Sequence, residues 1–119
     1  MRQGWPAAIA VAMLMGGMPS PALAASEREL ETLSRNGKAA LEDGQYELAE
    51  KLFRQWADAV PAQSPAATDA RIGLARAAYG RKAYRDMLEI LSPAAAPRRG
   101  QPFAAAYRYH RALALVELG

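Results

Sequence analysis

The stretch DGQYELAEKLFRQWADAVP, residues 43–61, carries the pattern that decides the fold of this chain. It predicts a tight turn, then an amphipathic helix, then a stop at the final proline. Residues three and four apart share one face of a helix. The expected buried face combines Leu48, Ala49, Leu52, Phe53 and Trp56. A helix with such a stripe needs a partner helix on each side to bury it.

The preceding partner helix is predicted over residues 26–42, where apolar side chains follow helical spacing. Ser26 and Glu29 have the S-x-x-E spacing of a capping box, which marks the start of this helix. Gly37 in its middle costs about 1 kcal/mol relative to alanine. We therefore expect close packing of Gly37 against Ala49 of the next helix to compensate for that cost.

The rest of the chain predicts further helices and an all-α fold, because alanine is abundant and is the best helix former. Helices are expected over residues 46–59, 66–79, 84–91 and 103–118. Ser64 and Pro65 supply the cap and first position of the third helix. The segment 93–102 contains prolines and a glycine, which predict a loop. The pattern around Tyr46 recurs further along the chain, around Tyr84.

Six residues of the first helix pair match a known repeat pattern: Gly37, Gly44, Tyr46, Ala49, Phe53 and Pro61. Their spacing resembles the tetratricopeptide repeat (TPR) family, whose unit is a helix–turn–helix of about 34 residues. The resemblance implies a right-handed α-solenoid of antiparallel helix pairs with about 2.5 repeats. These repeats would fall at about 30–63, 68–101 and 105–119, the last of them incomplete.

The final predicted helix, residues 103–118, would be the first half of a third repeat. Solenoids usually end in a capping helix with a polar outer face. We therefore expect this chain to be a fragment of a longer protein. Otherwise the final helix is itself the cap, or a second subunit covers it.

Residues 1–24 resemble a cleaved secretory signal peptide, with Arg2 in the positive region, a short apolar run and an A-x-A cleavage site. A membrane anchor is the alternative, but a bilayer needs about 20 apolar residues and this run is far shorter. The absence of an Arg-Arg pair from the positive region before the apolar run favours the general secretory route. The mature domain, 25–119, resembles envelope TPR proteins of Gram-negative bacteria, which implies a periplasmic protein without an integral membrane segment.

Composition and charge exclude several classes of protein. The sequence has no cysteine, which excludes disulfides, thiol catalysis and a lipidated N-terminus. The net charge is +3, but export and the lack of a basic–aromatic motif argue against a nucleic-acid partner. Residues 27–58 carry a net charge of −3, and residues 69–117 carry +5. This asymmetry is consistent with a solvated helical surface rich in arginine, and alternatively with a basic concave face that suits an acidic protein segment.

No catalytic, metal or cofactor site is expected, and the chain is not predicted to be an enzyme. His110 is the only histidine, and the zinc-binding HExxH and phosphate-binding glycine motifs are absent from the sequence. A lone histidine on an arginine-rich helix is more typical of a surface or packing position. Phe103, Tyr107 and Tyr109 could form a sugar-stacking strip, with core packing or groove lining as the favoured alternative.

In the TPR family, the first helix of each pair lines a concave groove. The resemblance assigns the candidate binding residues to Lys38, Leu41, Ile72, Arg76, Tyr79, Tyr109 and Leu113. Their apolar, aromatic and basic mixture suits an extended or helical peptide, which makes a protein or acidic peptide the expected partner. The alternative for Leu41, Ile72 and Leu113 is that they only pack between repeats.

The leading hypothesis is a periplasmic TPR scaffold for protein–protein interactions in envelope assembly or export. The second is the N-terminal TPR region of a larger outer-membrane component that exports polysaccharide or protein, of which this chain is a fragment. The third is an accessory to an enzyme or a lytic activity. Further repeats in the parent reading frame would favour the scaffold, whereas alternating strands would favour a β-barrel porin.

Overall fold

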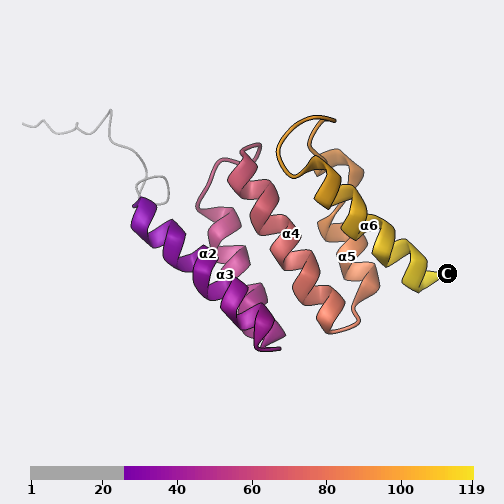
Figure 1. The fold of residues 1–119 in the computed structure, drawn as a ribbon, viewed down its shortest axis with the longest axis horizontal. Helices are drawn as coiled ribbons and strands as arrows, with labels where there is room; N and C mark the ends of the chain where they lie inside the picture. Colours follow the sequence, from indigo (N-terminus) through magenta and orange to yellow (C-terminus); the bar gives the residue numbers. More distant parts are fainter. Residues whose placement is uncertain (1–25) are drawn as a thin grey trace, which may run out of the picture.

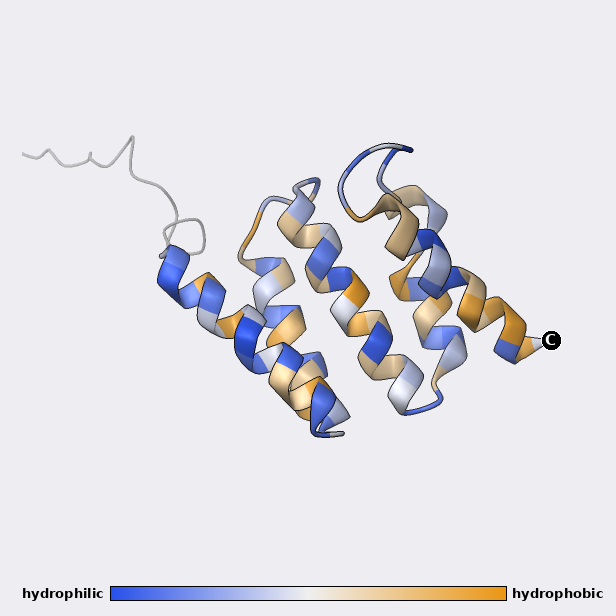
Figure 2. Ribbon diagram, viewed as in Figure 1, coloured by the Kyte–Doolittle hydropathy of each residue, from blue (hydrophilic) through white to orange (hydrophobic). Residues whose placement is uncertain are grey.

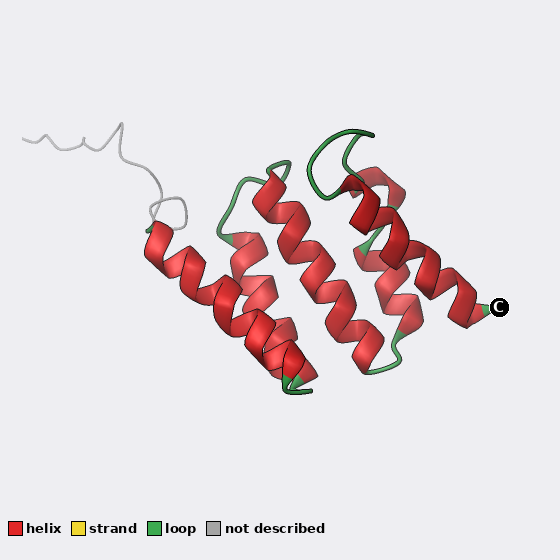
Figure 3. Cartoon of the chain, in the orientation of Figure 1, coloured by secondary structure: helices red, strands yellow, loops and turns green. Residues whose placement is uncertain are grey.

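A computed structural model describes residues 26–119, and within this range the chain is helical and contains no strand (Figures 1 and 3). The elements are α2 (Glu27–Glu42), α3 (Tyr46–Asp58), α4 (Pro65–Gly80), α5 (Tyr84–Ile90), the short 3-10 helix η1 (Pro93–Ala95) and α6 (Ala104–Leu118). The all-α prediction is therefore confirmed for the described range. The predicted signal peptide, 1–24, lies outside the described residues.

The α-helices pack in the order of the sequence. Each contacts the next one, and α4 also contacts both α2 and α6. Figure 1 shows α2, α4 and α6 side by side in front, with α3 and α5 behind them. None of these helices combines the length and the hydropathy needed to span a lipid bilayer.

The N-termini of α2 and α4 are capped by the serine side chains that the sequence predicts. The Ser26 hydroxyl accepts a hydrogen bond from the Glu29 amide at 3.0 Å, and the Ser26 amide donates to Glu29 Oε1 at 2.9 Å. This closes the capping box on α2. Ser64 caps α4 in the same way, since its hydroxyl accepts from the Ala67 amide at 3.2 Å. The segment expected to be a loop differs from the prediction, because it contains the short helix η1.

The turn between α2 and α3 has nearly the same geometry as the turn between α4 and α5. Gly44 and Lys82 occupy equivalent positions and have left-handed φ angles of 75° and 63°. In both turns the following residue donates its amide to a carbonyl near the end of the preceding helix at 2.8 Å, from Gln45 to Ala40 and from Ala83 to Ala78. The repeat in the sequence is thus also a repeat of backbone conformation.

The centre of the core is the ring of Phe53, which lies between Gly37 of α2 and Gly73 of α4. A Cβ atom on Gly37 would lie 3.1 Å from the ring, and one on Gly73 would lie 2.5 Å from it. The three atoms nearest to such a Cβ atom on Gly37 all belong to Phe53, which lies one helical turn after Ala49 on α3. The expected packing of Ala49 against Gly37 stays a prediction. Ala49 is fully buried in the same cluster.

Two apolar clusters make up the core. The first joins α2, α3 and α4 through Ala40, Ala49, Phe53, Trp56, Ala70, Leu74 and Ala77. The second joins α4, α5 and α6 through Ile72, Ala75, Ala78, Met87, Leu91, Tyr107 and Ala114. Because α4 contributes to both clusters, it is buried around most of its circumference. Leu48 differs from its prediction as a buried residue, since 44% of its surface is exposed.

Replacing Phe53 by alanine should lower the free energy of unfolding by about 3–5 kcal/mol, because it empties the space between two glycines. Urea denaturation followed by circular dichroism measures this loss. A loss below about 1 kcal/mol would contradict the central position of this ring.

Gly73→Ala tests the close approach of α3 to α4. The added methyl group overlaps the Phe53 ring, and overpacking of this kind costs about 1–3 kcal/mol. Alanine recovers about 1 kcal/mol in helix propensity, so we expect a net loss of up to about 2 kcal/mol. In a Phe53→Leu background the same change should be neutral or stabilising. Equal losses in the two backgrounds would show that the ring and the glycine are not coupled.

Candidate functional site

One hollow on the described part of the chain is formed by helices that are far apart in the sequence. It has a volume of about 340 Å³ and is lined by Leu41, Tyr46, Arg76, Tyr79, Gly80, Tyr109, His110 and Leu113. These residues come from the end of α2, the start of α3, the second half of α4 and the middle of α6. We call it the basic hollow, because it contains an arginine and a histidine but no carboxylate.

The basic hollow brings together most of the candidate groove residues. Leu41, Arg76, Tyr79, Tyr109 and Leu113 all line it. Two candidates lie elsewhere. Ile72 is buried in the second core cluster, which is the packing role that the sequence left open for it. Lys38 lies outside the lining of the basic hollow, although α2 supplies both Lys38 and Leu41.

Lys38 is held near a second hollow. Its ammonium lies 3.6 Å from Asp69 Oδ2 and 5.8 Å from the centroid of the Trp56 ring. Asp69 and Trp56 both line a hollow of about 270 Å³, together with Glu27, Leu30, Glu31, Ser34 and Ala66. An exposed ion pair of this kind stabilises the fold by at most about 1 kcal/mol. The ammonium of Lys38 neutralises part of the negative charge of this second hollow, which Glu27, Glu31 and Asp69 line.

Arg76 is the main charged group of the basic hollow. It is exposed, and within residues 26–119 no carboxylate lies within 4.0 Å of its guanidinium. Tyr79, one turn further along α4, is held edge-on against Tyr84 with the ring centroids 5.7 Å apart. The hollow thus presents a cation beside an aromatic surface, a combination that suits a carboxylate with an apolar neighbour.

His110 is engaged with its own helix. Its Nδ1 lies 2.8 Å from the Ala106 carbonyl oxygen, which can only accept, so Nδ1 is the donor. The imidazole also packs edge-on against Tyr109, with ring centroids 5.2 Å apart. Among the described residues, no group of three histidine, aspartate or glutamate side chains gathers to hold a metal ion. The geometry gives His110 a packing role at the rim of the hollow.

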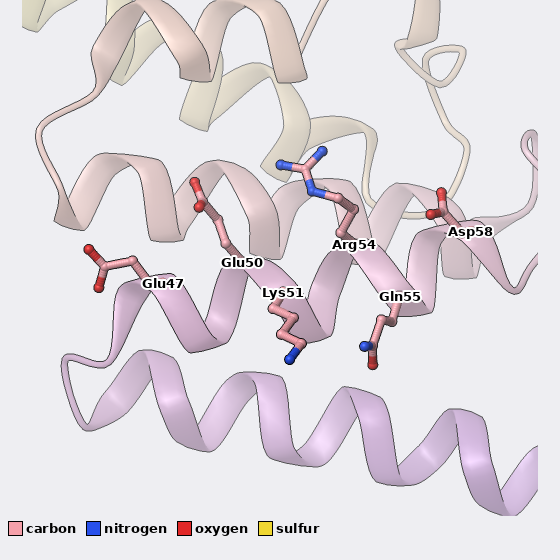
Figure 4. A pocket seen from close by; sticks show the side chains of 6 residues that line it. All are labelled: Glu47, Glu50, Lys51, Arg54, Gln55 and Asp58. Carbon is pink, nitrogen blue, oxygen red and sulfur yellow. The ribbon is translucent and has the colours of Figure 1, made fainter.

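A third hollow lies along the outer surface of α3. Figure 4 shows that the side chains lining it all come from this one helix and point in different directions. They are Glu47, Glu50, Lys51, Arg54, Gln55 and Asp58. Glu50 is already paired with Arg81, whose Nη2 lies 2.5 Å from the carboxylate. The arrangement is that of a solvated helix face, without converging groups.

Three residues of the basic hollow were not predicted from the sequence as groove residues: Tyr46, Gly80 and His110. A Cβ atom on Gly80 would overlap the ring of Tyr46, so the glycine allows the start of α3 to approach the end of α4. Tyr46 belongs to the repeat pattern of the sequence, and this pattern is the feature that could have identified it as a groove residue. Its contact with Gly80 joins segments that are far apart in the sequence, and helical spacing does not report such contacts.

Tyr107 fixes α6 relative to α5, and so positions the α6 side of the basic hollow. Its ring is buried in the second cluster, and its hydroxyl donates to the Ser92 carbonyl oxygen at 2.6 Å. Burial raises the pKa of the phenol, and the positive charges of nearby Arg71 and Arg111 oppose this rise. The neutral phenol is therefore the form that the folded state stabilises.

Tyr107 should make the fold sensitive to alkaline pH. Tyrosine in an unfolded chain ionises near pH 10, whereas the raised pKa of folded Tyr107 keeps its proton in place to a higher pH. The unfolded state then binds fewer protons, so the stability present below about pH 10 is lost as the pH rises. The free energy of unfolding in urea between pH 8 and 11 should fall less steeply for Tyr107→Phe than for the wild type. Equal slopes for the two proteins would contradict a raised pKa of Tyr107.

No protein-family model, curated protein sequence or solved structure matches this chain.

Proposed function

We propose that the chain is a TPR-type protein, a right-handed solenoid of antiparallel helix pairs with about 2.5 repeats. The recurring turn supports this fold, since Gly44 and Lys82 share a left-handed conformation and the same amide-to-carbonyl bonds. Gly119 also has a positive φ, of 90°, and its amide donates to Val116 as that of Lys82 donates to Tyr79. The packing order, with α4 touching α2 and α6, supports an inner layer of first helices.

The function we propose is that of a periplasmic scaffold for protein–protein interactions in envelope assembly or export. The observation that carries it is the basic hollow, in which distant helices converge on an exposed arginine among tyrosines. Periplasmic location rests on the signal-like pattern of residues 1–24. A rigid helical layer that presents a mixed apolar and charged surface is suited to binding a peptide segment.

The partner segment should place a glutamate or aspartate beside an aliphatic or aromatic residue. Arg76 would receive the carboxylate, because a guanidinium forms charge-assisted hydrogen bonds of about 1.5–3 kcal/mol. Tyr79 and Tyr109 would cover the neighbouring apolar side chain. The half-buried Leu41 and Leu113 supply the floor of the same hollow.

Selection of random octapeptides on the purified protein should therefore enrich acidic residues next to apolar ones. Arg76→Glu should weaken binding of the selected peptides by about 10–100-fold, as expected for loss of a charge-assisted contact. Fluorescence anisotropy measures the affinity, and circular dichroism checks that helicity is unchanged. Arg85→Glu is the matched control, since Arg85 is exposed on α5 outside the hollow. Equal affinity of Arg76→Glu and the wild type would refute the basic hollow as the binding site.

A further inference from the structure

A fourth hollow, of about 270 Å³, lies where two loops meet the first half of α4. Figure 1 shows the loop between α3 and α4 and the loop between α5 and α6 at the same end of the molecule. Both loops and α4 contribute polar side chains to the lining, namely Gln63, Thr68, Arg71, Arg98 and Gln101. No acidic side chain of the described residues lines this hollow. We call it the two-arginine hollow.

Neither arginine of the two-arginine hollow has an anionic partner. Within residues 26–119, no carboxylate lies within 4.0 Å of either guanidinium. Arg71 is half-buried, and its Nη1 donates to the Ile90 carbonyl oxygen at 3.4 Å. A guanidinium has five N–H donors, so most of those on Arg71 remain for a ligand. Two cations that line one hollow repel each other, and an anion bound between them would remove this repulsion.

Backbone and side-chain hydrogen bonds hold the loops that line this hollow. In the first loop, the Ser64 hydroxyl donates to the Pro61 carbonyl oxygen at 2.7 Å. In the second loop, the Gln101 amide donates to the Arg98 carbonyl oxygen at 2.9 Å, which closes a turn whose two end residues both line the hollow. Figure 2 shows that the outer part of this second loop is hydrophilic. Donors that are already in place lose less conformational freedom when a ligand binds.

We propose that the two-arginine hollow binds the phosphate group of a small hydroxylated molecule, such as a sugar phosphate. A phosphate monoester carries a charge of about −1.5 to −2 at pH 7 and three acceptor oxygens, which matches the guanidinium groups of Arg71 and Arg98. A carboxylate has one charge and two oxygens, so it would leave part of this donor set unused. The hollow is slightly smaller than the pockets of about 300–1,000 Å³ that hold drug-sized ligands, which favours a small molecule.

The two glutamines suit the hydroxylated part of such a ligand. Each side-chain amide both donates and accepts hydrogen bonds, as a hydroxyl group does, so Gln63 and Gln101 can bind hydroxyls beside the phosphate. This site lies on the first half of α4, whereas Arg76 and Tyr79 of the basic hollow lie on the second half. The proposal therefore does not depend on the function proposed for the basic hollow.

Titration of the isotope-labelled full chain with glucose-6-phosphate, followed by NMR at constant ionic strength, tests the proposal. The side-chain amide signals of Gln63 and Gln101 should shift saturably, with a dissociation constant of about 0.1–1 mM. Arg98→Gln should weaken binding at least about tenfold, because it removes a charge-assisted contact. Arg99→Gln is the matched control, since Arg99 is the exposed neighbour in the same loop, loses the same charge and does not line the hollow. Circular dichroism checks that both variants keep their helicity.

Three further probes separate the parts of the ligand. Inorganic phosphate should shift the same signals with lower affinity, and glucose should shift none. The proposal would be overturned if glucose-6-phosphate failed to saturate below about 10 mM, or if glucose bound equally well. Equal weakening by Arg98→Gln and Arg99→Gln would overturn it too, because it would indicate attraction to the net charge alone. Tighter binding to vesicles of phosphatidylglycerol than to glucose-6-phosphate, lost in Arg98→Gln, would assign the hollow to a lipid surface instead.

Discussion

The contact of the Phe53 ring with two glycines is the constraint on which the remaining packing depends. Gly37 and Gly73 lie on different helices, and both lack the side chain that would keep α3 away. One aromatic ring therefore sets the separation of α2, α3 and α4. The glycines reduce helix propensity by about 1 kcal/mol each, and burial of the ring offsets this by about 1.5–3 kcal/mol.

A second aromatic ring packs against a glycine at the edge of the basic hollow. Gly80 lets the ring of Tyr46 lie against the end of α4, so the start of α3 is held next to Arg76 and Tyr79. Farther along, Tyr107 holds α6 by burial of its ring and by its hydrogen bond to Ser92. One side of the hollow is thus positioned by the close packing of Tyr46 on Gly80, and the other side by the buried ring of Tyr107. Its charged group, Arg76, is exposed.

The helix α4 connects the two core clusters of the described residues. It is covered on two sides, by α3 and by α5 with α6, and it contributes residues to both core clusters. The helix α6 is covered on one side only, although its sequence pattern follows that of α4. On α6, Leu115 and Val116 are exposed.

The sequence by itself determined the helices, their caps and the turns between them. Ser26, Ser64 and Gly44 act through local hydrogen bonds and local backbone geometry, which helical spacing and residue type report directly. It also placed five candidate groove residues that line one hollow, because the repeat pattern assigns faces to the first helix of each pair.

Tertiary structure alone decided which side chains cover which face. It buried Ile72, exposed Leu48, set the Phe53 ring against Gly37 and Gly73, and added Tyr46, Gly80 and His110 to the basic hollow. These outcomes depend on helices that approach from distant parts of the chain. Helical periodicity defines an apolar stripe on each helix, but the width of its covered part depends on the size and position of its neighbours.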